Sequence, residues 1–333
     1  MSPSKATVEA PSNIALIKYW GATDLDRAIP AAPSLSMTLR TCTTRTTAAF
    51  HDGRSGDDTV QVADETGTLH AADADFAAPV VRHLDRLRDA FDRHGTFRVA
   101  THNRFPSAAG IASSASGFAA LTMAATRALG LDLDPAALST WARRSGSGSA
   151  ARSVFGGYVV WPEGPDVAAA QVLPHTHWDL RDVIAVVDAT PKAVSSREGH
   201  RRAPSSPFFE TRLDHLSDRL ETVRTALEAR DVETLGEAVE REGVELHLIA
   251  LSSRPPIFYW TPATLAVLQA VRDLRASGVA AYATMDAGAN VHVLCPAADE
   301  PQVAARLTAM AEVQQVLRDG VGPGPTYDVA PLF

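Results

Sequence analysis

The chain has 333 residues, of which 45% are apolar and 21% are charged. This length and ordinary globular composition predict one large domain or two moderate ones, and they exclude wholesale disorder. The net charge of −8 disfavours binding along the phosphate backbone of nucleic acids, although an acidic protein can hold an acidic metabolite in a local basic pocket.

Two cysteines, Cys42 and Cys295, lie far apart in the sequence and match no metal-binding spacing. We therefore expect neither a disulfide framework nor a structural zinc site, and we interpret both as reduced core thiols. Residues 1–13 carry no apolar run of the kind found in signal peptides, and no stretch approaches the length of a membrane span. These features predict a cytoplasmic protein without a membrane partner.

The first half of the chain is predicted to mix strands with two helices. Short apolar runs, most of them rich in Val or Thr, predict strands at residues 13–20, 34–50, 59–63, 97–103 and 156–161. Apolar residues recur every three or four positions at 75–93, which predicts an amphipathic helix. Small residues form a predicted loop at 106–117, and an Ala-rich helix is expected over 116–129.

The second half is predicted to be richer in helix. Helical periodicity covers 213–227 and 235–249, with a break near Asp231. Further expected elements are strands at 168–173, 182–188, 279–285 and 290–295, a helix that begins at Thr261-Pro262 and ends near Gly278, and a last helix at 301–318. The polar, basic segment 195–207 is interpreted as a loop and a candidate hinge or lid. The sum is an α+β fold, with a composition shift that predicts lobes at 1–185 and 186–333.

Two segments of small residues have the chemistry of anion-binding loops. In residues 106–117, Gly110 and the small side chains let backbone N–H groups approach a phosphate at the start of a helix, although no Walker lysine follows. In residues 145–153, Ser147, Ser149 and Arg152 offer two hydroxyls and a guanidinium suited to a carboxylate or phosphate. Taken alone, each segment is equally compatible with an ordinary loop.

Two charged residues stand at the ends of apolar segments. Asp286 lies in a turn between two predicted strands, where it is either turn chemistry or a carboxylate held as a base. Lys18 ends an apolar strand, which brings an ammonium to the rim of a site. Neither residue is informative by itself.

Together these segments resemble one family, the decarboxylases of phosphorylated mevalonate within the GHMP kinase superfamily. The matching strings are A-P-S-N-I-A-L-I-K-Y-W-G from Ala10, N-R-F-P-S-A-A-G-I-A-S-S-A-S-G-F-A-A-L from Asn103, G-S-G-S-A-A-R-S-V-F-G-G from Gly146, Asp286-Ala287-Gly288 and, more weakly, L-S-S-R-P-P-I-F-Y-W from Leu251. Their order and spacing hold over nearly the whole chain, and the strings around Lys18 and Arg152 are far more specific than the superfamily's phosphate loop.

The resemblance implies a two-lobed α+β fold, with a ribosomal-S5-like N-terminal lobe and a ferredoxin-like C-terminal lobe. It implies ATP and Mg²⁺ as cofactors, a small phosphorylated mevalonate as substrate, and a homodimer; it gives no metal ligands. It assigns Asp286, Lys18 and Arg152 to catalysis. Substrate binding is assigned to Tyr19, Ser147, Ser149, Arg152, Ser196 and Arg197, and ATP binding to Pro106, Ala109, Gly110, Ile111, Ala112, Ser113, Ser114 and Ser116.

The chemistry implied by the family fits these residue types. A tertiary alcohol is a poor leaving group, so ATP phosphorylates the 3-hydroxyl while Asp286, kept ionised by Lys18, orients or deprotonates it. Phosphate then leaves, and carbon dioxide is lost from the carboxylate held by Arg152. The product is an alkene used in isoprenoid biosynthesis.

The sequence departs from the family pattern at Ala22, where members that use the diphosphate carry a lysine for the terminal phosphate. This departure predicts 5-phosphomevalonate as the substrate and isopentenyl phosphate as the product, with Arg201 and Arg202 as cations able to compensate. The alternatives are a diphosphomevalonate decarboxylase making isopentenyl diphosphate and a 3-kinase that does not decarboxylate. A further alternative, a silent binding module, fits the complete Asp–Lys–Arg set poorly.

Overall fold

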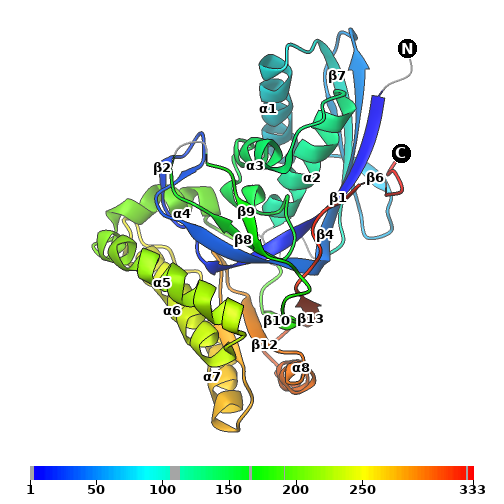
Figure 1. The fold of residues 1–333 in the computed structure, drawn as a ribbon. Coiled ribbons are helices and arrows are strands. Elements are labelled where there is room, and N and C mark those ends of the chain that lie inside the picture. Colours follow the sequence, from blue (N-terminus) through cyan, green and yellow to red (C-terminus); the bar gives the residue numbers. More distant parts are fainter. Residues whose placement is uncertain (1–3, 106–112, 165–166, 191, 328) are drawn as a thin grey trace.

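The computed structural model describes residues 4–105, 113–164, 167–190, 192–327 and 329–333. The chain folds into two lobes, each built on its own sheet, and both lobes combine strands with helices (Figure 1). This arrangement confirms the α+β class predicted from the sequence. None of the helices in the described ranges is both long and apolar enough to cross a membrane.

The N-terminal lobe is organised by two long antiparallel strands, β1 and β4, which pair from Ser4↔Phe50 to Ile17↔Leu35. The sheet runs in the order β14-β1-β4-β7-β5-β6, and β8 and β9 continue it from the other end of β4. Its strands are β1 (Ser4–Ile17), β4 (Ser34–Asp52), β5 (Thr59–Ala63), β6 (Leu69–Ala71), β7 (Gly95–Asn103), β8 (Tyr158–Trp161), β9 (Ala170–Leu173) and β14 (Thr326–Tyr327). A small hairpin of β2 (Ala22–Asp24) and β3 (Ile29–Pro30) follows β1.

Three helices pack against this sheet: α1 (Ala74–Ala90), α2 (Ser113–Ala128) and α3 (Pro135–Arg143). Helix α2 is almost entirely buried, and its many alanines let it lie close to β1 and β4. The Asp73 side chain caps α1 by accepting from the Phe76 N–H, and Asp134 caps α3 by accepting from the Ala137 N–H. The sequence did not predict α3, whose short length gives little periodicity.

The C-terminal lobe has a four-stranded antiparallel sheet in the order β11-β12-β10-β13. Its strands are β10 (Leu180–Val186), β11 (Tyr282–Thr284), β12 (Val291–Pro296) and β13 (Gln315–Gly320). One face is covered by α7 (Pro262–Ala276) and α8 (Glu300–Thr308), which share a buried core with it. The other face packs against α5 (Phe209–Ala229) and α6 (Val232–Ser252).

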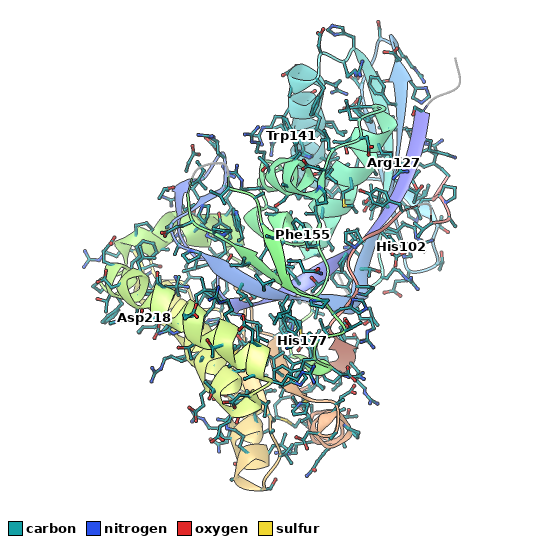
Figure 2. The ribbon with its side chains drawn as sticks, viewed as in Figure 1. His102, Arg127, Trp141, Phe155, His177 and Asp218 are labelled. Carbon is teal, nitrogen blue, oxygen red and sulfur yellow. The ribbon has the colours of Figure 1, made fainter. Side chains whose placement is uncertain are left out.

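A shared apolar core joins the two lobes. It combines Ile14 and Leu16 of β1 with Ile184 of β10, Leu216 of α5 and Val239 of α6, all at most 1% exposed. His177, labelled in Figure 2, lies against the end of α5, where its Nε2 donates to the Leu227 carbonyl at 3.0 Å. The packing of α5 and α6 therefore fixes the position of β1 relative to the second sheet.

Two predicted elements differ in the structure. Residues 195–207 were expected as a loop but form α4 (Ser196–Arg202) and a 3₁₀ turn (Ala203–Ser205). The Ser195 hydroxyl caps α4 by accepting from the Glu198 N–H. The predicted helix at 301–318 ends at Thr308, and β13 follows because residues 315–320 pair with β10.

Other predictions from composition are met or stay open. Cys42 and Cys295 are free and buried, which confirms two core thiols without a disulfide. The division at residues 185 and 186 stays a prediction. Near it, β10 belongs to the second sheet and β14 returns to the first.

Candidate active site

A buried ion pair joins the two lobes. Lys18 directly follows β1, Asp286 lies two residues beyond β11, and Lys18 Nζ is 2.8 Å from Asp286 Oδ1. The lysine side chain is 1% exposed, whereas the aspartate is 25% exposed and so remains open to a ligand. Burial alone would raise the pKa of Asp286, but the attraction of Lys18, helped by His292, outweighs it and holds that pKa below its usual value. The arrangement provides an ionised carboxylate that faces open space.

Arg152 is held in the same site by polar side chains of the N-terminal lobe. The guanidinium is 2% exposed, and it donates to Ser34 Oγ at 2.6 Å and to Asn13 Oδ1 at 3.2 Å. Burial lowers its pKa to about 10, while the charge of Asp286 favours the protonated form. Arg152 is therefore a preoriented cation close enough to Asp286 for their charges to interact.

Ser147 precedes a short 3₁₀ turn (Gly148–Ala151), and Ser149 lies within this turn, which Arg152 follows. Their hydroxyls lie 3.3 Å apart, and Ser147 Oγ donates to Ser114 Oγ at 3.2 Å. Ser114 is the second residue of α2, so the serine pair borders the N-terminus of that helix. A Cβ at Gly148 would lie 2.5 Å from the Tyr19 ring, so only glycine allows Tyr19 to pack here.

Tyr19 and His200 form an aromatic wall with ring centroids 4.1 Å apart. Burial lowers the pKa of His200 to about 3, and its neutral Nδ1 accepts from the Gly21 N–H at 3.0 Å. Burial raises the pKa of Tyr19, so it stays protonated, and the nearby charges of Arg152, Arg143 and Arg197 oppose that rise. The wall is thus uncharged and surrounded by cations.

The segment that ends in α4 brings two more cations to this wall. Lys192 Nζ donates to Ser196 Oγ and to the Ala287 carbonyl, both at 2.8 Å. Arg197 donates to the Leu25 carbonyl at 3.0 Å and pairs with the exposed Asp26 at 2.7 Å. Sequence reasoning missed Lys192, whose only signal is a lysine four residues before the predicted Ser196.

Ala22 carries only a methyl group, so the chain has no cation at this position. Arg201 and Arg202, named as compensating cations, both pair with Glu198 on their own helix. Lys192 donates to Ser196, and Arg197 directly follows Ser196 in α4, so both cations lie beside a residue predicted to bind the substrate.

The predicted ATP loop is only partly described. Pro106, Ala109, Gly110, Ile111 and Ala112 lie outside the described residues, while Ser113 and Ser114 open α2. The Ser116 side chain is fully buried and bonded to Thr44 Oγ1 at 2.6 Å. Its hydroxyl therefore faces the sheet, and the assignment of Ser116 to ATP binding stays a prediction.

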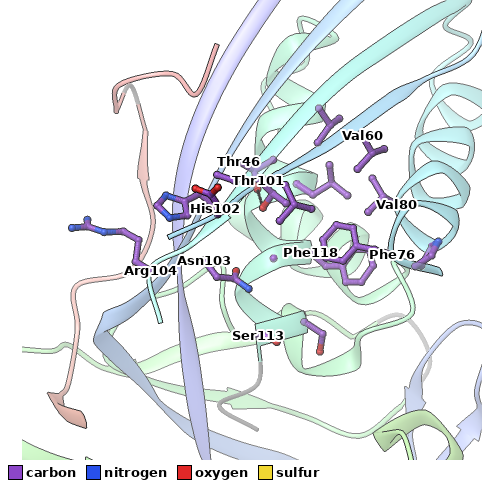
Figure 3. Close-up of a pocket in the computed structure, with 18 of the residues that line it drawn as sticks. Thr46, Val60, Phe76, Val80, Thr101, His102, Asn103, Arg104, Ser113 and Phe118 are labelled. Atoms are coloured by element: carbon purple, nitrogen blue, oxygen red, sulfur yellow. Dashed lines mark hydrogen bonds between the residues drawn. The ribbon is translucent and has the colours of Figure 1, made fainter. Parts of the chain in front are cut away.

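Next to this helix start lies a cavity of about 940 Å³ that the sequence did not reveal. Apolar walls come from Val60, Val80, Phe76 and Phe118, and Figure 3 shows these side chains gathered on the right of the view, with His102, Asn103 and Arg104 on the left. Ser113, Ser114, Thr101, His102, Asn103 and Arg104 add polar groups on one side. Because Ser114 also contacts Ser147, the cavity and the Arg152 site meet at the N-terminus of α2.

Comparison with known proteins identifies the family. Residues 10–171 match the family of the diphosphomevalonate decarboxylase-like N-terminal domain, and residues 182–325 match the mevalonate 5-diphosphate decarboxylase C-terminal domain. The diphosphomevalonate decarboxylase of Aspergillus fumigatus is 36% identical over 347 residues, which cover 98% of this chain and 84% of that relative.

Solved structures agree with the sequence comparison. The mevalonate diphosphate decarboxylase of Staphylococcus aureus superposes with a TM-score of 0.91 at 31% identity, covering 98% of both chains. A structure described as MDDEF in complex with MVAPP, AMPPCP and magnesium gives a TM-score of 0.90 at 35% identity, covering 99% of this chain and 100% of that one. The resemblance to phosphorylated-mevalonate decarboxylases and the GHMP kinase-like fold are thereby confirmed.

Proposed function

The chain belongs to the diphosphomevalonate decarboxylase family, and we propose that it uses ATP to convert mevalonate 5-diphosphate into isopentenyl diphosphate. The other products are ADP, inorganic phosphate and carbon dioxide. The observation that supports this proposal most directly is that the Lys18–Asp286 pair lies in the same site as the buried Arg152. The carboxylate of this pair is 25% exposed.

Asp286 begins the reaction at the 3-hydroxyl of the substrate. Its carboxylate accepts the hydroxyl proton while the oxygen attacks the γ-phosphorus of ATP and the bond to ADP breaks. Lys18 stabilises the ionised carboxylate before the transfer. The tertiary hydroxyl, a poor leaving group, thus becomes a phosphate ester.

Arg152 acts in the second stage. The bond from C3 to the phosphate oxygen breaks, and the electron pair of the bond to the carboxylate carbon forms the new double bond as carbon dioxide leaves. Arg152 holds the carboxylate in a bidentate manner through this step, and the Ser147 and Ser149 hydroxyls orient the same group.

ATP occupies the cavity beside α2. The apolar walls accept the purine, and the phosphates reach the N-terminus of α2 at Ser113 and Ser114, where backbone N–H groups and the helix dipole favour anions. Among the described residues there is no cluster of three or more His, Cys, Asp or Glu side chains for a metal ion. Mg²⁺ would be held mainly through the ATP phosphates, as is usual in nucleotide enzymes, and would neutralise part of their charge. A fold neighbour solved with AMPPCP and magnesium supports both cofactors.

The proposed substrate is mevalonate 5-diphosphate and no longer the 5-monophosphate that was predicted from Ala22. Relatives and fold neighbours are diphosphomevalonate decarboxylases. The charges around Tyr19 and His200 also favour a polyanion, because Lys192, Arg143, Arg152 and Arg197 all act on these two rings. The terminal phosphate then meets Lys192 and Arg197, and a cation at residue 22 is not required.

Substrate preference tests this proposal. We expect the wild-type kcat/KM for mevalonate 5-diphosphate to exceed that for the 5-monophosphate by roughly 10- to 100-fold, because the second phosphate gains charge-assisted hydrogen bonds. Carbon dioxide release from the two substrates is measured side by side. A preference for the monophosphate that Ala22→Lys reverses would show that the missing cation at residue 22 decides the substrate.

Arg152→Lys is expected to damage turnover although it keeps the charge. Lysine loses the planar fork that reaches both Ser34 and Asn13, so its ammonium is neither preoriented nor bidentate. We expect kcat/KM to fall by about 10- to 100-fold, measured as carbon dioxide release at saturating ATP. Unchanged kinetics would exclude Arg152 from the carboxylate site.

A further inference from the structure

Side chains of the C-terminal lobe form hydrogen bonds with both the N–H and the carbonyl group of Lys18. Glu242 of α6, which is fully buried, accepts from the Lys18 N–H through Oε1 at 3.0 Å. Arg212 of α5, 3% exposed, donates to the Lys18 carbonyl at 3.0 Å and also pairs with the same Glu242 oxygen. These contacts fix the peptide groups on either side of the Lys18 Cα.

The side chains that contact the Lys18 backbone belong to a network of buried charges. Arg219 pairs with the second Glu242 oxygen and with Glu245, so two arginines and two glutamates form one network. Burial raises the pKa of Glu242, but Arg212 and Arg219 outweigh it and keep the carboxylate ionised. Buried ion pairs add little net stability compared with well-packed apolar residues, because desolvation offsets their attraction. Stability alone is therefore a weak reason for charges at this place.

The same helix also lies against the segment that carries Asp286. A Cβ on Gly243 would be 3.0 Å from Thr284 Oγ1 and 3.3 Å from the Met285 N, so α6 approaches this backbone as closely as glycine permits. Gly236, two turns earlier, similarly faces the Tyr282 ring. His247 is buried one turn after Gly243 and lies near Asp286, whose charge opposes the lowering of the His247 pKa by burial.

We infer that α6 sets the distance between Lys18 and Asp286, with Glu242 as a positioning residue that acts through the backbone of Lys18. Glu242 holds one partner of the pair, and Gly243 packs closely against the backbone next to the other. Both members of the pair are thus located against one rigid helix, although they come from different lobes. The inference rests on the roles proposed above for Lys18 and Asp286.

Glu242→Gln tests the inference, and Glu245→Gln is the matched control. Both changes remove a carboxylate that pairs with Arg219, but only Glu242 contacts Lys18. We expect Glu242→Gln to lower kcat by at least about tenfold while the KM for ATP changes less than about twofold. The control should retain the wild-type kcat.

The pH profile separates positioning from a loss of stability. The groups that act on Asp286 are Lys18 after β1, Arg152 after the 3₁₀ turn, His292 on β12, His247 on α6 and Lys192 before α4. Of these five groups, only Lys18 is contacted by Glu242. Displacing its ammonium weakens the ionised form of Asp286, so the acidic limb of kcat/KM moves to higher pH, by about half a pH unit or more.

A second variant keeps the inference testable if Glu242→Gln does not fold. Gly243→Ala removes no charged group, and its added methyl group pushes α6 away from Thr284 and Met285. We expect the same pattern, a lower kcat with an unchanged KM for ATP. Wild-type kcat and an unshifted pH profile in the folded variants would overturn the inference. Wild-type carbon dioxide release, and its loss in Asp286→Asn, test the proposed function separately.

Discussion

Asp286→Asn is expected to reduce turnover by roughly 10²- to 10⁴-fold, the range that a positioned general base contributes. Asparagine keeps the size of the side chain but removes the charge that takes the hydroxyl proton. Among the described residues that line the nucleotide cavity, Asp286 does not occur, so the affinity for ATP should change little. Single-turnover release of ADP and carbon dioxide measures the loss.

Asp218→Asn is the matched control for this change. Asp218 is an exposed residue of α5, labelled in Figure 2, and lies outside the site. It should keep the wild-type rate. If Asp286→Asn retained more than about a tenth of that rate, only about 1.4 kcal/mol of the barrier would depend on the carboxylate, and Asp286 would not be the base.

Lys18→Met is expected to reduce kcat about 100-fold and to change its pH dependence. Methionine fills a similar volume but removes the ammonium whose attraction outweighs the burial of Asp286. The pKa of Asp286 then rises. A base works in its ionised form and is lost as the pH falls through its pKa, so the acidic limb of kcat/KM moves to higher pH.

The control for this limb is the reaction of the wild-type enzyme at matched ionic strength, because screening also weakens charge interactions near the surface. The Lys18–Asp286 pair is too buried on the lysine side for salt to mimic the substitution. An acidic limb that stays in place in Lys18→Met would mean that another group titrates there.

The proposed catalytic residues could be predicted from the sequence because each lies within a contiguous motif. Lys18, Arg152 and Asp286 each occur within a short motif that fixes their local backbone, and the structure brings all three to one site. Lys192 and Glu242 were not predictable, since their contacts arise only when distant segments pack together. In a sequence, a lone charged residue in a helix is interpreted as part of a solvent-exposed face.

The errors in the fold have similar causes. The Ser- and Pro-containing composition of 195–207 favours a loop, but the Ser195 cap and the pairing of Glu198 with Arg201 and Arg202 stabilise a short helix. Residues 315–320 form a strand because the edge of β10 is available to pair with them. Such non-local pairing overrides local propensity.

The substrate prediction from Ala22 illustrates a different limit. A missing cation at one position was read as the loss of a phosphate subsite, but the charge of a pocket is set by every side chain that reaches it. Arg197 donates to the Leu25 carbonyl across 172 residues of the chain, so its position beside the β2–β3 hairpin depends on the packing of distant segments. The homodimer implied by the family stays a prediction, as does the cytoplasmic location predicted from the sequence itself.

The central claim is that one site couples phosphoryl transfer to decarboxylation of mevalonate 5-diphosphate. It is tested most directly by quantifying ADP, inorganic phosphate and carbon dioxide in the same wild-type reaction with that substrate. The account predicts equal amounts of all three, because the phosphate placed on the 3-hydroxyl leaves as carbon dioxide is lost. ADP formed without phosphate or carbon dioxide would contradict it and identify the protein as a 3-kinase.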